Sequence, residues 1–225
     1  GVAEAAGRRE VVARLRGWQF SAMSNGGEEP FFDIENRCSA CDARSMNTND
    51  FLRAQRGQAT KRQRWQAGAI LEIPVAENCW AYGQLGEEYV VAVFEGMFSE
   101  RPAIEDLIHL PILFKSFVYR DVVSKGFWLK VGRVEPRSDV MNEDYRFKQD
   151  KISGALSLYH SDFAEQGWER PALLSECLEL ECVAVWEASH VEDRIIAARN
   201  GQECKWVSSL AIDVPRVPAH QNDIH

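Results

Sequence analysis

The clearest pattern in the chain is a series of apolar runs, separated by short turns, between about residues 65 and 215. Segments 68–75 and 79–85 are rich in β-branched, aliphatic and aromatic residues, and the short turn between them predicts a hairpin. Residues 89–94 are apolar at consecutive positions, which predicts a central strand with both faces covered. Three strands joined by short turns predict a curled antiparallel sheet, similar to the opening of an SH3-like barrel.

Four more segments have the composition of strands. They are residues 112–119, 127–134, 156–159 and 205–212. The polar residues of segment 135–150 predict a loop. The domain is therefore expected to be β-rich.

One segment near the C-terminus has apolar residues at every second position, and it precedes a predicted helix. Apolar and polar residues alternate at the start of segment 178–186, which predicts a strand. The buried face of this strand would hold Leu178, Leu180, Cys182, Ala184 and Trp186.

The helix signals follow directly. Ser189 and Glu192 match the S-x-x-E capping box, and Asn200 with Gly201 is a usual C-terminal signal, so we expect a helix that ends near Arg199. Its buried side would consist of Val191, Ile195 and Ala198. The predicted fold class is α+β and β-rich, with a curled antiparallel sheet and a C-terminal helix packed on it.

Charge is divided unevenly along the chain. Residues 1–66 hold eleven Lys and Arg against eight Asp and Glu, whereas residues 67–225 hold 15 against 26. An acidic body repels phosphate and suits a basic protein partner. We expect an N-terminal extension at 1–60, partly helical or irregular, and a β-rich domain at 61–225 that ends in a polar tail after residue 215.

The apolar runs and the cysteines both bear on the compartment. The longest apolar stretches are far shorter than the ~20 residues that cross a bilayer, so we expect a cytoplasmic protein with no membrane partner. Of the six cysteines, only Cys38 and Cys41 have the spacing of a metal or redox pair, and a zinc site needs a second such pair. The thiols are expected to be reduced and structural.

The sequence contains no assembled catalytic motif. It has no G-x-S-x-G elbow, no H-E-x-x-H pair and no phosphate-cradling glycine loop. His190, Glu192 and Asp193 lie on the first turn of the predicted helix, where successive residues point about 100° apart, so a shared site is awkward. We therefore expect no enzyme activity, no cofactor and no metal; a hydrolase that uses His190 or a cysteine stays open as an alternative.

Two charged segments are candidates for contact with a partner. Asp139, Glu143 and Asp144 lie in the polar loop and are predicted to form part of an interface with a basic protein, because opposite charges steer association. The basic run at 53–64 supports an alternative, in which the chain is a nucleic-acid-binding module. We expect instead that this run faces solvent, since no aromatic residue on which bases could stack is interleaved with it before Trp65.

Four short motifs resemble one family of known proteins. They are Trp65-x-x-Gly68-x-Ile70-x-x-Ile73-Pro74, Trp80-Ala81-Tyr82-Gly83-Gln84-Leu85, Gly126-Phe127-Trp128-Leu129-Lys130-Val131-Gly132 and Trp186-x-x-x-His190-Val191-Glu192-Asp193-Arg194. Through these motifs, residues from about 62 to 214 resemble the immunity protein 26 family of bacterial polymorphic toxin systems. The resemblance implies a cytoplasmic immunity protein that binds a cognate toxin domain and neutralises it by occlusion, without catalysis of its own.

Overall fold

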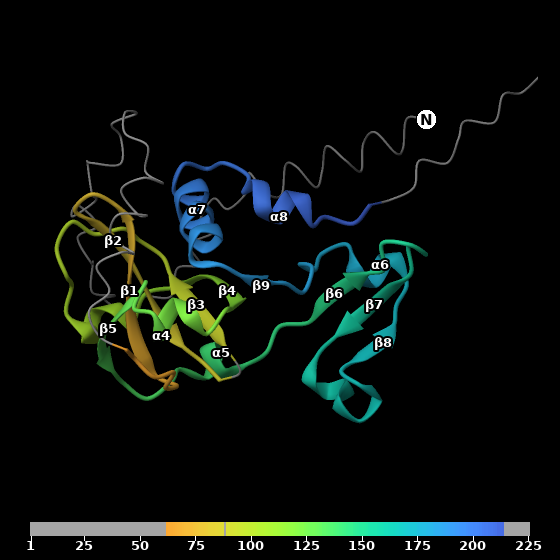
Figure 1. The fold of residues 1–225 in the computed structure, drawn as a ribbon, viewed down its shortest axis with the longest axis horizontal. Coiled ribbons are helices and arrows are strands. Elements are labelled where there is room, and N and C mark those ends of the chain that lie inside the picture. Colours follow the sequence, from red (N-terminus) through yellow and green to blue (C-terminus); the bar gives the residue numbers. More distant parts are fainter. Residues whose placement is uncertain (1–61, 88, 214–225) are drawn as a thin grey trace, which may run out of the picture. The chain divides into compact units, whose positions relative to one another are not determined.

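The computed structural model describes residues 62–87 and 89–213, which form an α+β structure rich in strands (Figure 1). Several predictions fall outside these residues. They concern the extension at 1–60, the Cys38 and Cys41 pair, most of the basic run at 53–64 and the tail after residue 215. No helix of the described ranges is long and apolar enough to cross a membrane.

The larger sheet has six strands in the order β5-β1-β2-β3-β4-β9. Neighbours pair antiparallel except β4 and β9, which pair parallel. The predicted meander of the first three strands is confirmed. The strands are β1 (Ala69–Ala76), β2 (Cys79–Leu85), β3 (Val90–Phe94), β4 (Ile112–Val118), β5 (Leu129–Arg133) and β9 (Val185–Trp186). Because β5 and β9 stand at opposite ends of this order, the sheet is open and does not close into a barrel.

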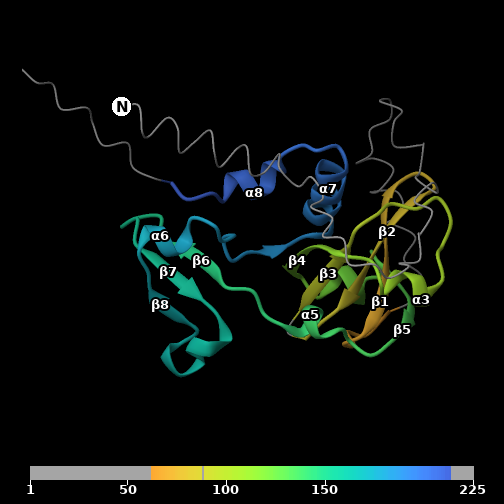
Figure 2. The same ribbon diagram turned by 180° about the vertical axis from the view of Figure 1, so that it is seen from behind.

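A smaller antiparallel sheet follows β5 in the chain. It consists of β6 (Arg146–Gln149), β7 (Leu156–Tyr159) and β8 (Glu169–Pro171). Five short helices lie between strands, and two more helices follow the last strand in the described part of the chain (Figure 2). They are α3 (Ile104–Leu107), α4 (Asp121–Ser124), α5 (Ser138–Met141), the 3-10 helix η2 (Ser161–Gln166), α6 (Leu174–Cys177), α7 (Ala188–Arg199) and α8 (Lys205–Ser209).

The larger sheet is covered on both faces. Along β1, Leu71 and Ile73 belong to one core together with Val191 and Ile195 of α7, so this helix packs on that face. The alternate residue Ile70 belongs to a second core that includes residues of α3. Side chains alternate between the faces of a strand, so continuous burial of β1 requires a cover on each side.

Gly68 connects the ends of three strands. Its N–H donates to Leu85 O at 2.7 Å, and its carbonyl accepts from Val134 N at 3.0 Å. Gly68 has a φ of 81°, and a Cβ at this position would lie 2.2 Å from Val134 O. The glycine of the Gly68-x-Ile70 motif is therefore required by the backbone conformation and by close contact.

One buried hydrogen bond joins α7 to the segment that leads into β5. Trp128 Nε1 donates to Glu192 Oε1 at 3.0 Å, and both side chains are fully buried. A buried carboxylate is costly unless it accepts hydrogen bonds. The bond therefore helps to fix the position of α7 on the sheet and its rotation about the helix axis.

The prediction of a strand at 205–212 is wrong, because residues 205–209 form α8. The apolar residues Trp206, Val207 and Leu210 recur at helical spacing, so the pattern suits a helix equally well. Packing decides between the two, since Trp206 Nε1 donates to Asp193 on α7 at 2.8 Å and all three apolar residues pack on the larger core.

The prediction of a strand at 178–186 is wrong for most of its length, and only the two residues of β9 are in a strand. Leu178 is 60% exposed, while Cys182 packs in the core of the smaller sheet and Trp186 in the core of the larger one. The alternating residues thus divide between separate cores. The loop predicted at 135–150 is also partly wrong, because β6 begins at Arg146 and its residue Phe147 is buried.

The predicted helix at the C-terminal side is confirmed as α7, but its start is different. The N-cap is Glu187, with no side-chain capping bond, so Ser189 lies inside the helix and the predicted capping box is wrong. Because β9 ends at Trp186, the chain enters the helix two residues earlier than expected. Val191 and Ile195 are buried as predicted, whereas Ala198 is exposed.

Replacing Trp128 by Phe should lower the free energy of unfolding by about 2–4 kcal/mol, because the buried Glu192 carboxylate loses the hydrogen bond from the indole and the smaller ring fills the core less well. Trp206→Phe is the matched control: it removes an indole donor to a carboxylate at a half-buried position and should cost about 1 kcal/mol. Urea unfolding followed by circular dichroism measures both. Equal losses in the two variants would contradict a special role for the buried bond.

Ser116→Ala should stabilise the protein by about 1 kcal/mol. Ser116 is fully buried in β4, and its hydroxyl has no hydrogen-bond partner among the described residues. Ser157→Ala is the control, since Ser157 Oγ donates to Glu169 at 3.0 Å and its removal should destabilise. Thermal unfolding shows whether each variant is more or less stable than the wild type. A destabilised Ser116→Ala variant would refute the prediction.

Candidate functional site

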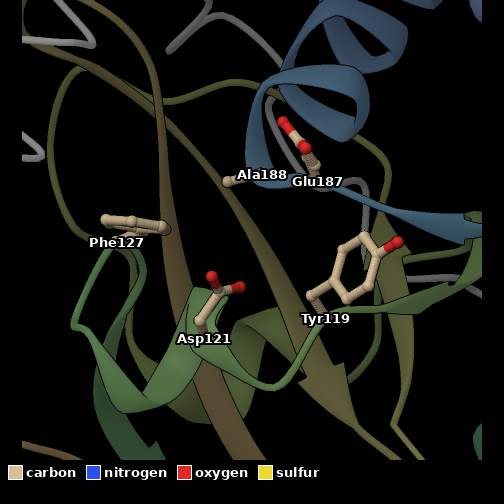
Figure 3. Close-up of a pocket in the computed structure, with 5 residues that line it drawn as sticks. All are labelled: Tyr119, Asp121, Phe127, Glu187 and Ala188. Atoms are coloured by element: carbon tan, nitrogen blue, oxygen red, sulfur yellow. The ribbon is translucent and has the colours of Figure 1, made fainter.

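A pocket of about 330 Å³ opens between α4 and the N-terminal end of α7 (Figure 3). Two segments supply its walls, one around α4 and the other at the start of α7. The residues that line it are Tyr119, Asp121, Phe127, Glu187 and Ala188.

Strand pairing brings these two segments together. Parallel pairing of β4 with β9 aligns Val118 with Trp186, and Tyr119 N donates to Trp186 O at 3.1 Å. The segments that follow β4 and β9 therefore leave the sheet at the same end. One leads to Asp121 in α4, and the other leads to Glu187. The pocket therefore lies where two parallel strands end, at the edge of the sheet.

A second set of bonds holds the α4 segment. Trp128 N donates to Val122 O at 3.0 Å, which closes the loop that contains Phe127. Because the Trp128 indole is also bonded to Glu192 of α7, the loop and the helix are tied to each other. Both pocket walls are thus positioned by buried groups rather than by surface contacts.

The pocket combines two carboxylates with two aromatic rings. In Figure 3 the Asp121 carboxylate points toward the start of α7, with the rings of Phe127 and Tyr119 on either side of it. Asp121 pairs with Lys125 at 2.9 Å, yet its side chain is still 39% exposed. The Glu187 side chain is exposed and makes no capping bond to α7. Such a set of groups can hold an ammonium or guanidinium group, because the carboxylates attract it and ring faces bind cations.

The structure places the predicted acidic residues in separate intramolecular pairs. Arg137 Nε donates to Asp139 Oδ1 at 3.0 Å, and the hydrogen bonds from Arg137 hold the pKa of Asp139 below its ordinary value of 3.8. Lys115 Nζ lies 2.7 Å from Asp144 Oδ1. About half of each aspartate side chain remains exposed, so both still contribute to the local field.

Glu143, the third predicted residue, belongs to a polar cluster on the smaller sheet. It accepts a hydrogen bond from Ser161 N at 2.8 Å and lies 3.8 Å from His160 Nε2. The imidazole Nδ1 of His160 accepts from Asp162 N at 3.0 Å, and Tyr145 stacks on the ring with centroids 3.9 Å apart. Through these bonds the cluster organises the start of η2.

The expectation that His190, Glu192 and Asp193 point in different directions holds for Glu192 alone. Glu192 is bonded to Trp128, whereas Asp193 accepts from Trp206 and lies 3.2 Å from Lys205 Nζ. The His190 ring also lies against Trp206, with centroids 4.0 Å apart, because residues three apart share a helix face. Glu192 thus ties α7 to the segment before β5, while His190 and Asp193 tie it to α8.

Sequence reasoning did not single out any residue of the pocket. Tyr119, Asp121 and Phe127 are more than fifty positions from Glu187 and Ala188 in the chain, and no motif links the two groups. A signal for them would have required knowledge that β4 and β9 pair in parallel. Over residues 62–87 and 89–213, no three His, Cys, Asp or Glu side chains are grouped so that they could hold a metal ion.

Acid should destabilise the smaller sheet before the larger one. Hydrogen bonds lower the pKa of Asp150 (from Ser153), of Glu169 (from Lys148) and of Glu176 (from Arg170), below ordinary values of 3.8 for Asp and 4.5 for Glu. The folded state therefore binds fewer protons at these groups than the unfolded state. Their stabilisation is present above the ordinary pKa values and is lost as the pH falls through the lowered ones.

NMR spectra of backbone amides recorded from about pH 6 down to about pH 2 test this order. Signals from β6, β7 and β8 should lose dispersion at a higher pH than signals from β1, β2 and β3. Simultaneous loss in both sheets would contradict the prediction.

No family model, curated protein or solved structure matches the chain. The resemblance to immunity proteins therefore rests on the motifs of the sequence alone. The function has to be argued from the geometry of the pocket.

Proposed function

We propose that the chain is a cytoplasmic immunity protein, which binds a basic toxin domain and blocks it by occlusion. The observation that carries the proposal is the pocket at the start of α7, which is lined by Asp121, Glu187 and two aromatic residues. The sequence motifs support the same class of function. The SH3-like character of the first three strands is part of this proposal and rests on sequence alone.

The size of the pocket suits one long side chain. A volume of about 330 Å³ is near the lower end of the range for small-molecule sites, and it is ample for an Arg or Lys side chain. Tyr119, which lines the pocket, is 51% exposed and available to a partner. Arg and Tyr are enriched among the hot spots of protein interfaces, so an Arg of a partner beside this ring is a suitable anchor.

Rigidity favours binding at this place. The Trp128–Glu192 bond and the pairing of β4 with β9 hold the walls before a partner arrives. A preformed site loses less conformational entropy on association than a loop that must be ordered. The pocket is therefore better prepared for a partner than a flexible acidic surface would be.

The acidic loop has a different part in the proposal. Asp139 and Asp144 lie outside the residues that line the pocket, and their half-exposed side chains attract a partner through the long-range field. Their predicted effect is on the rate of association rather than on the final contacts. Direct contact by Asp139, Glu143 and Asp144 stays a prediction from the sequence.

Co-expression with a toxin domain, should a neighbouring gene encode one, tests the proposal. The wild-type chain should restore growth, and the double variant Asp121→Lys with Glu187→Lys should bind the purified toxin at least about thirtyfold more weakly, because two attractive contacts become repulsive. Growth assays and isothermal titration calorimetry measure the two effects.

The matched control is the double variant Glu179→Lys with Glu203→Lys. It makes the same change of net charge at exposed positions away from the pocket, and should rescue growth like the wild type. Failure of the wild type to rescue or to bind would refute the function. Equal weakening in the two double variants would refute the pocket as its site.

A further inference from the structure

A second opening, of about 730 Å³, lies along the free edge of β5 and has the opposite charge. The segment before β1 forms its far wall, and β5 forms its floor. The residues that line this groove are Arg62, Gln63, Arg64, Gln66, Arg101, Leu129, Lys130 and Val131.

The far wall is fixed by hydrogen bonds to the edge strand. The side-chain amide of Gln63 donates to Trp128 O at 2.8 Å and accepts from Lys130 N at 2.8 Å. These are the two backbone groups that an added strand would use at this edge. Lys130 Nζ also donates to Arg64 O at 3.0 Å, so the wall is held at two points and the groove is a built feature.

Four cationic side chains surround the groove. Arg62 and Arg64 are exposed, and Lys130 comes from β5 itself. Arg101 is neutralised in part by the nearly buried Glu72, with Nε and Oε2 2.8 Å apart, but 56% of its side chain remains accessible. In a domain with an acidic balance, this is a concentrated site of positive potential.

The floor distinguishes between two kinds of anionic ligand. Leu129, which is 50% exposed, and Val131 line the groove together with the cationic groups. Single-stranded nucleic acids bind through aromatic side chains on which bases stack, and no aromatic residue is among those that line the groove. An aliphatic floor with cationic walls matches a peptide that carries both carboxylates and an aliphatic side chain.

We propose that the groove along β5 binds an extended acidic peptide segment of another protein. Its carboxylates contact Arg62, Arg64 and Lys130, and an aliphatic side chain of the segment covers Leu129. The site is separate from the pocket at α7 and takes a ligand of opposite charge, so it adds a second binding activity to the proposed function.

Fluorescence anisotropy with a labelled Glu-Leu-Glu-Asp-Leu-Glu-Asp peptide tests the proposal on the full chain. The peptide should bind saturably and more weakly as salt is raised, and Arg62→Glu and Arg64→Glu should each weaken binding at least about tenfold. In the structure the described role of Arg64 in the wall is through its carbonyl, so the fold should survive this change. Thermal unfolding verifies that both variants are folded.

Three comparisons sharpen the test. Arg199→Glu changes an exposed cation on α7 and should leave binding within about twofold of the wild type. The pocket variant Asp121→Lys with Glu187→Lys should also bind the peptide normally, which separates this site from the proposed toxin site. A peptide with Gln and Asn in place of Glu and Asp should not bind.

Several outcomes would overturn the proposal. They are the absence of saturable binding to the acidic peptide, equal binding of the neutral peptide, and unchanged affinity in both groove variants. Tighter binding of a twelve-nucleotide oligo-dT than of the peptide, with the same loss in the variants, would assign the groove to nucleic acid instead.

Discussion

The hydrogen bond from Trp128 Nε1 to Glu192 Oε1 holds α7 to the larger sheet, and both walls of the pocket depend on it. Its two residues are 64 positions apart and fully buried. A buried carboxylate without a donor is strongly unfavourable, so the helix has little freedom to shift along the sheet. The pocket residues Asp121 and Glu187 are exposed, yet their positions follow from this buried contact.

The stretch from α4 through the start of β5 contributes to both proposed binding surfaces. Phe127 lines the acidic pocket, while Leu129 and Lys130 line the basic groove. Trp128 lies between them and anchors this stretch in the core. One short segment thus presents opposite charges to two sides, and its buried tryptophan fixes both arrangements.

The sequence was most informative where short turns separate continuous apolar runs. Strands β1, β2 and β3 were predicted from such runs, and helix α7 from its end signals and the spacing of Val191 and Ile195, whereas the strict period of two at 178–186 was misleading. Trp206 and Leu210 fit either a strand or a helix, and only the contact with Asp193 on α7 selects the helix. The pocket was not predicted, because parallel pairing of β4 with the two-residue β9 leaves almost no trace in local sequence. The acidic residues Asp139 and Asp144 were singled out for their charge. Their partners, Arg137 and Lys115 of β4, were not predicted.

Hydrogen exchange of the chain, alone and in complex with the toxin domain of the co-expression experiment, tests the central claim most directly. If the pocket is the binding site, the toxin should slow exchange in segments 119–128 and 185–189, which form its two walls. The remaining strands of the larger sheet should change little, since the site is preformed. Protection confined to other segments, such as 139–144, with both pocket walls unchanged would contradict the account.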